Sequence, residues 1–153
     1  FMPVDCDPHY VALSGYPLDV FYRNLGLVPA RSITVILDAC FSGASDQGML
    51  IQQASPMFIE VDQTLSGGRA NVLASATGTQ ISSWYTEGRH SLFTYYFLRG
   101  LRGEADIDQN REVTLGEMQR YIEEHVPYMA RRLFGRDQTP VIKGDLNQVL
   151  SRY

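Results

Sequence analysis

One buried strand with an abrupt end constrains the fold of this chain more than any other feature. Residues 32–37 read Ser-Ile-Thr-Val-Ile-Leu, a β-branched and almost continuously apolar run. Such runs are typical of strands that are buried on both faces of a parallel sheet. The run ends in Asp38-Ala-Cys-Phe-Ser-Gly43, where small residues and a glycine predict a tight exit. The sequence therefore predicts an α/β fold with polar and reactive side chains at the end of a buried strand.

Further strand and helix patterns alternate along the chain, as in other α/β domains. A second apolar run over 71–76 predicts another central strand. A short strand over 139–142 is expected at the sheet edge, because Pro140 has no N–H for a neighbouring strand. Helices are predicted over 17–25, 91–101 and 114–133. We expect Pro127 to kink the last helix or divide it in two.

Residues 44–69 show neither the spacing of apolar residues typical of a helix nor that typical of a strand, and they are rich in Ser, Gln and Gly. We expect them to form a long linker between the two central strands, of the kind that serves as an access loop or a processing site. No internal repeat divides the rest of the chain. The sequence therefore predicts a single domain over residues 1–153.

Composition excludes several classes of protein. The chain has 153 residues, of which 44% are hydrophobic, so it can bury a core and disorder is excluded. Its net charge of −4 offers no basic surface for nucleic acid or an anionic membrane. No apolar run approaches the roughly 18 residues of a membrane span, and no secretory signal is visible at the start. Two cysteines are too few for a disulfide framework or a Cys-based zinc site. We expect a cytoplasmic protein that binds neither nucleic acid nor a membrane.

Cys40 lies at the place where open parallel sheets bind their ligands, just beyond the carboxyl end of a strand. A thiolate there needs a base or a positive environment, and its own backbone N–H can help to bind an oxyanion. The alternative is an inert core residue, because cysteine is among the most buried residue types. Position alone leaves both interpretations open.

The segment VILDACFSG at 35–43 resembles the nucleophile motif of the caspase-like cysteine peptidases, the clan of caspases, metacaspases, paracaspases and their bacterial relatives. The order that follows is similar too, with a linker, a strand, a substrate loop at 81–85 and two helices, so the resemblance covers nearly the whole chain. It implies a three-layer fold in which helices flank a mostly parallel sheet. It also implies an endopeptidase that acts on a protein or peptide substrate through Cys40.

Asp38 resembles the aspartate that metacaspases and paracaspases place two residues before the cysteine, in a pocket for a basic side chain before the scissile bond. We expect Asp38 to be buried, because a buried carboxylate in a narrow pocket attracts Arg or Lys through charge-assisted hydrogen bonds. The substrate loop carries Ser83-Trp84-Tyr85 and lacks the arginine of the Ser-Trp-Arg sequence in caspases. The resemblance therefore implies cleavage after Arg or Lys, substrate contacts from all four residues, and closeness to bacterial metacaspase-like or paracaspase-like proteins. The alternative for Asp38 is a strand-end residue that caps backbone N–H groups.

The general base that this family uses is missing from its expected place in the sequence. The family has a His followed by Gly roughly 50 residues before the cysteine, whereas only His9, in another context, precedes Cys40 here. His90 is expected to cap or pack the helix that follows it, and His125 to lie on a solvated helix face. We therefore expect the catalytic His in an N-terminal segment of the same precursor, and a fold that is incomplete at its N-terminus. The alternative is a catalytically silent caspase-like scaffold for interactions.

Arg69 is the last basic residue before the second central strand. If Asp38 selects basic residues, Arg69 is a candidate self-processing site in the linker. The alternative is an ordinary solvated arginine, because exposed loops tolerate such residues.

An acidic loop precedes the last helix. Asp106, Asp108, Asn110 and Glu117 occupy positions 1, 3, 5 and 12 of an EF-hand-like spacing, which makes calcium a candidate ligand. Position 6, normally glycine, is Arg111. Thr114-x-x-Glu117 also reads as a capping box that starts the helix without any ion. The sequence thus requires no cofactor, and a calcium-responsive regulatory domain is a further alternative.

Overall fold

The two long apolar runs form adjacent parallel strands in the computed structural model, which describes Asp5, Asp7 and residues 10–39, 44–45, 48–49, 69–77 and 80–153. β1 (Ile33–Leu37) pairs in parallel with β4 (Ala70–Ala74), and β8 (Val141–Lys143) pairs antiparallel with the other edge of β4. The described sheet has the order β1–β4–β8 and is mixed, whereas a mostly parallel sheet was expected. Among the described strands, β8 lies at the edge of the sheet, as predicted for the strand that contains Pro140.

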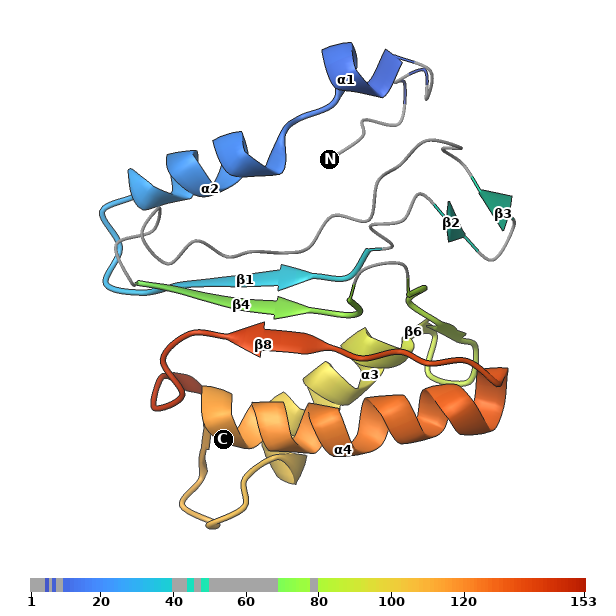
Figure 1. The fold of residues 1–153 in the computed structure, drawn as a ribbon. Helices are drawn as coiled ribbons and strands as arrows, with labels where there is room; N and C mark the ends of the chain where they lie inside the picture. The colour runs from blue at the N-terminus through green and yellow to red at the C-terminus, as the bar shows by residue number, and fades with distance from the viewer. Residues whose placement is uncertain are drawn as a thin grey trace.

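Helices cover both faces of this sheet and make a three-layer α/β architecture (Figure 1). α2 (Leu18–Gly26) packs on one face, where Tyr22 meets alternate residues of the strands, among them Val35 and Val72. α3 (Leu92–Arg99) and α4 (Leu115–Phe134) cover the other face, where Leu73 and Ile142 enter the larger core. Successive side chains of a strand point to opposite faces, which is why Val72 and Leu73 belong to different cores. The expected α/β caspase-like fold class agrees with this arrangement.

Side chains at the helix starts explain where α3 and α4 begin. The Ser91 hydroxyl accepts a hydrogen bond from the Thr94 backbone N–H at 3.1 Å, which makes Ser91 the N-cap of α3. Thr114 and Glu117 form a reciprocal capping box at α4, as the sequence predicted. α4 continues across Pro127 as one helix, so the division that was expected as the alternative to a kink is wrong. Val126 and Ala130 on either side of Pro127 are buried in one core, and their packing offsets the lost backbone hydrogen bond.

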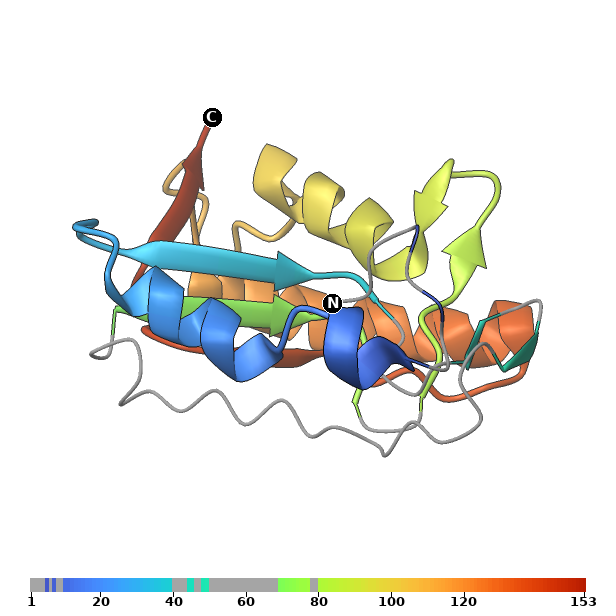
Figure 2. The ribbon, with the colours of Figure 1, turned by 90° about the horizontal axis from the view of Figure 1, so that it is seen from above.

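Shorter elements complete the described part of the chain (Figure 2). Two-residue strands form the β2–β3 pair inside the expected linker and the β5–β6 pair before α3, and β7 pairs with β9 near the C-terminus. The bounds are α1 (Val11–Ser14), β2 (Ala44–Ser45), β3 (Gly48–Met49), β5 (Trp84–Tyr85), β6 (His90–Ser91), the π-helical turn η2 (Gly100–Glu104), β7 (Glu112–Thr114) and β9 (Val149–Arg152). Within the described ranges, no helix is long and apolar enough to cross a membrane.

Candidate active site

Asp38 follows the last residue of β1, and three hydroxyl groups converge on its carboxylate. Oδ1 accepts a hydrogen bond from Ser82 Oγ at 2.7 Å. Oδ2 accepts hydrogen bonds from Ser91 Oγ and Thr94 Oγ1. Hydroxyl donors that approach both oxygens fix the plane of this carboxylate. Asp38 is exposed, so the expectation of a buried carboxylate is wrong. The carboxylate is therefore held between the substrate loop and the start of α3.

The start of α3 contributes two of these donors, and its geometry follows from its cap. Ser91 accepts from the Thr94 N–H while it donates to Asp38, so one hydroxyl serves the helix and the carboxylate together. The partial positive charge of a helix N-terminus also favours a nearby anion. His90, expected to cap or pack this helix, is instead exposed in β6, and the cap is Ser91. Sequence reasoning missed Ser91 and Thr94, although a serine just before a helix is a common N-cap.

The predicted substrate loop presents its predicted residues in different ways. Ser83 is buried, its backbone N–H donates to Gln138 Oε1 at 3.0 Å, and its carbonyl accepts from the Leu92 N–H at 2.8 Å. Both backbone groups of Ser83 are therefore used inside the chain. Trp84 is 55% exposed, and Tyr85 is half-buried with its hydroxyl on Glu87 at 2.9 Å. Trp84 is thus the member of the loop that is most open to a ligand.

The predicted nucleophile, Cys40, lies outside the described residues, and so does His9. The neighbouring Ala39 is described, and its carbonyl accepts a hydrogen bond from Ser75 Oγ at 3.5 Å. This contact places the end of β1 beside the end of β4. The structure therefore describes the approach to Cys40 and the groups around Asp38.

His125 was expected on a solvated helix face, and that expectation is wrong. Its ring lies 4.3 Å from the Tyr121 ring and 5.2 Å from the Tyr96 ring, measured between centroids. Its Nδ1 lies 2.8 Å from the carbonyl oxygen of Tyr121. Residues four apart share a helix face, so His125 follows Tyr121 toward α3 while Glu123 and Glu124 face solvent. His125 thus belongs to an aromatic cluster between the two helices.

Arg69 anchors two elements to each other. Its guanidinium donates to the Gly26 carbonyl at 3.2 Å and to the Ala30 carbonyl at 3.3 Å, at and beyond the end of α2. Its own carbonyl accepts from the Ile33 N–H at 3.0 Å, and the next residue, Ala70, is only 3% exposed. Self-cleavage after Arg69 therefore requires these contacts to open first, and it stays a prediction.

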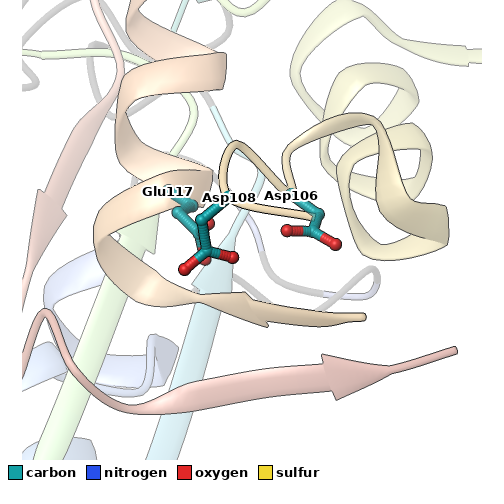
Figure 3. Close-up of side chains that lie close together, drawn as sticks. All are labelled: Asp106, Asp108 and Glu117. Atoms are coloured by element: carbon teal, nitrogen blue, oxygen red, sulfur yellow. The ribbon is translucent and has the colours of Figure 1, made fainter. Parts of the chain in front are cut away.

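The acidic loop brings three carboxylates together (Figure 3). One oxygen from each of Asp106, Asp108 and Glu117 lies within 4.8 Å of the others. Arg111, at the position where an EF-hand has glycine, adopts a left-handed φ of 67°. Oxygen ligands of this kind suit calcium. The side-chain oxygen of Asn110, the fourth predicted ligand, accepts from the Glu112 N–H at 2.7 Å.

Hydrogen bonds within the chain already serve these carboxylates. Asp106 Oδ2 accepts from the Arg111 N–H and the Tyr153 hydroxyl, both at 2.9 Å. Glu117 accepts from the Thr114 N–H at 2.9 Å and from the Ile107 N–H at 3.1 Å. Burial raises the pKa of both carboxyl groups, but these hydrogen bonds more than offset it and lower each pKa below its ordinary value. The capping role of Glu117 is confirmed, and calcium binding stays a prediction.

Comparison with known proteins gives one match. The family model described as a caspase domain matches residues 3–151, nearly the whole chain. No curated protein and no solved structure matches the chain.

Proposed function

This chain belongs to the caspase-domain family, and from that premise we propose that it carries the nucleophile of a cysteine endopeptidase that cleaves after Arg or Lys. The observation that carries the proposal is the Asp38 carboxylate, held by Ser82, Ser91 and Thr94 at the end of the strand that leads to Cys40. An exposed, oriented carboxylate beside a substrate loop is a binding site for a cationic side chain.

A bound arginine side chain satisfies this site well. Its guanidinium has five N–H donors in a planar fork, and the Asp38 carboxylate offers oxygens that accept two of them. The hydroxyl oxygens of Ser82 and Thr94 can accept further N–H groups once Asp38 is bound. Lys presents a single point charge and loses the bidentate geometry. Aspartate before the scissile bond places two carboxylates together, which is unfavourable.

Cys40 supplies the covalent step in this proposal. The general base takes the proton of the Cys40 thiol. The resulting thiolate attacks the scissile carbonyl carbon, and the carbonyl electrons move to the oxygen, where the backbone N–H of Cys40 donates a hydrogen bond. Collapse of this intermediate breaks the C–N bond, the amine leaves with a proton from the general base, and a thioester remains. Water, deprotonated by the same base, hydrolyses the thioester and returns the thiol.

We propose that the base is a His outside residues 1–153, in an N-terminal segment of the same precursor. The described histidines support this, because His90 is exposed on β6 and His125 is held in an aromatic cluster. The free edge of β1 gives such a segment a place to bind: within the described residues, this edge has no strand partner. Beside it lies an open, mostly apolar groove of about 620 Å³ lined by β1 and by Tyr16, Phe21 and Leu25. A strand added there would satisfy the unpaired backbone groups of β1.

The test of the proposed function is hydrolysis of matched fluorogenic peptides by the protein expressed from its complete gene. We expect cleavage after Arg and Lys that is abolished in Cys40→Ala. Absence of cleavage with every peptide, with and without calcium, contradicts the proposal and favours the alternative, a catalytically silent interaction scaffold.

A further inference from the structure

Gln138, just before β8, joins two segments that meet at the candidate site. Its side chain is completely buried. Nε2 donates to the Ser75 carbonyl at 3.0 Å, and Oε1 accepts from the Ser83 N–H at 3.0 Å. The partners settle which end of the amide is which, because Ser83 offers a donor and Ser75 an acceptor. The end of β4 and the substrate loop are thus linked through one side chain.

The link continues to the strand that leads to the predicted nucleophile. Ser75 is itself buried, and its N–H donates to the Leu37 carbonyl at 2.9 Å. Its hydroxyl donates to the Ala39 carbonyl at 3.5 Å. A polar chain therefore runs from Ala39 through Ser75 and Gln138 to Ser83. These hydrogen bonds connect the end of β1 to the substrate loop.

Thr139, the residue after Gln138, contacts Gln80, which lies just before the substrate loop. The Thr139 N–H donates to Gln80 Oε1 at 2.6 Å, and Gln80 Nε2 donates to the Thr139 hydroxyl at 3.2 Å. Residues 138 and 139 thus fix Gln80 and Ser83, two positions that bracket Ser82. Ser82 is the residue whose hydroxyl reaches Asp38.

We propose that Gln138 is a positioning residue, which acts through Ser83 to hold Ser82 against Asp38 and so sets the geometry of the pocket for the basic side chain. The proposal rests on the proposed function and adds to it a specificity-supporting residue that contacts no substrate. Glutamine suits this place because one uncharged side chain supplies a donor and an acceptor at the required separation. An apolar residue would leave the Ser83 N–H and the Ser75 carbonyl buried without partners.

Gln138→Met in the protein from the complete gene tests the proposal, because methionine keeps the length and removes both hydrogen-bonding groups. The matched control is Val126→Ala, a buried change in α4 that lowers stability and removes no hydrogen-bonding group. We expect Gln138→Met to raise KM for Arg peptides about tenfold with little change in kcat, because a displaced Ser82 no longer orients Asp38 and binding of the basic side chain weakens by about one hydrogen bond to a charged group. Val126→Ala lowers the melting temperature and leaves KM unchanged.

Trp84 gives a readout that does not depend on activity. It is the only tryptophan in the chain and directly follows Ser83, so the difference between each protein and its Trp84→Phe form isolates its fluorescence. We expect acrylamide quenching of Trp84 to change in Gln138→Met and to stay unchanged in Val126→Ala. If Gln138→Met does not fold, Gln138→Asn, which keeps the amide but cannot reach both partners, takes its place.

Three results overturn the proposal. One is a wild-type KM together with wild-type quenching in the Gln138 variant. Another is a rise in KM in both variants in proportion to their lost stability, which shows a structural role only. The third is that the wild-type protein cleaves no peptide and that Trp84 quenching is the same in the Gln138 variant as in the wild type. If no protein cleaves any peptide while Trp84 quenching changes only in the Gln138 variant, the proposed function fails and the loop-positioning role stands.

Discussion

Ser82 Oγ donates a hydrogen bond to Asp38 Oδ1 at 2.7 Å across 44 residues of sequence. The contact joins the end of β1 to the substrate loop, and Ser91 and Thr94 at the start of α3 complete the same carboxylate cluster. Three separate segments thus build one anionic site. Each donor can be removed by a small substitution, which makes the site open to test.

Removal of the Ser82 hydroxyl is expected to weaken recognition of basic residues. Ser82→Ala leaves Asp38 Oδ1 with one donor fewer and loosens the carboxylate. We expect kcat/KM for Arg peptides to fall roughly tenfold, the size of one hydrogen bond to a charged group. Ser14→Ala, which removes an exposed hydroxyl on α1 that donates to the Tyr10 carbonyl, is the control and leaves this ratio unchanged. Equal kcat/KM values for Ser82→Ala and wild type would show that the contact has no part in recognition.

Substitutions at Ser91 and Thr94 distinguish the effect of helix capping from the effect of the contact with the Asp38 carboxylate. Ser91→Ala removes the N-cap of α3 as well as a donor to Asp38, so the free energy of unfolding should fall by about 1 kcal/mol from the cap alone. Thr94→Val keeps the shape of the side chain and removes only its hydroxyl donor to Asp38. Urea denaturation of the two variants measures the difference. A Thr94→Val protein less stable than Ser91→Ala would contradict the assignment of the cap.

The lowered pKa of Glu117 predicts a loss of stability in acid. The unfolded chain binds a proton to this group at a pH where the folded chain does not, so folding is favoured above the ordinary glutamate pKa of about 4.3. Stability contributed by Glu117 is therefore lost as the pH falls through that value and then through the lower pKa of the folded state. Glu117→Gln, which keeps a capping side chain, should flatten the pH dependence of the urea midpoint between pH 6 and 3. An unchanged slope would argue against this contribution.

The acidic loop is expected to hold its structure without calcium. The capping box of Thr114 and Glu117 needs no ion, so a chelator should leave the melting temperature unchanged, and Thr114→Ala should lower stability by about 1 kcal/mol. Thermal unfolding with added chelator or calcium measures both effects. A calcium-dependent rise in melting temperature that disappears in Asp108→Asn would establish the alternative, a calcium site at Asp106, Asp108 and Glu117.

Local patterns predicted the elements that position the site. Continuous apolar runs gave the two parallel strands, and the capping box gave the start of α4 to the residue. The antiparallel direction of β8 could not be predicted from the sequence, because a three-residue strand carries no signal for the neighbour it pairs with. His125 shows a conflict of signals, since its glutamate neighbours indicated solvent while the spacing to Tyr121 indicated packing.

The surroundings of Asp38 depend on tertiary contacts that sequence patterns do not encode. Its partners Ser82, Ser91 and Thr94 lie 44 to 56 residues away and are ordinary small polar residues. Gln138 had no signal at all, because a single buried amide has no periodicity and follows no motif. Such residues become visible only when the fold brings their donors and acceptors together.

The central claim is that Asp38 selects a basic side chain through its charge, and the ratio of kcat/KM for an Arg peptide to that for the matched citrulline peptide tests it most directly. Citrulline keeps the shape of arginine and lacks its charge. We expect a strong preference for Arg in the protein from the complete gene, and a ratio near one in Asp38→Asn with citrulline cleavage retained. An Arg preference that persists in Asp38→Asn, or cleavage after Asp by the wild type, would contradict the claim.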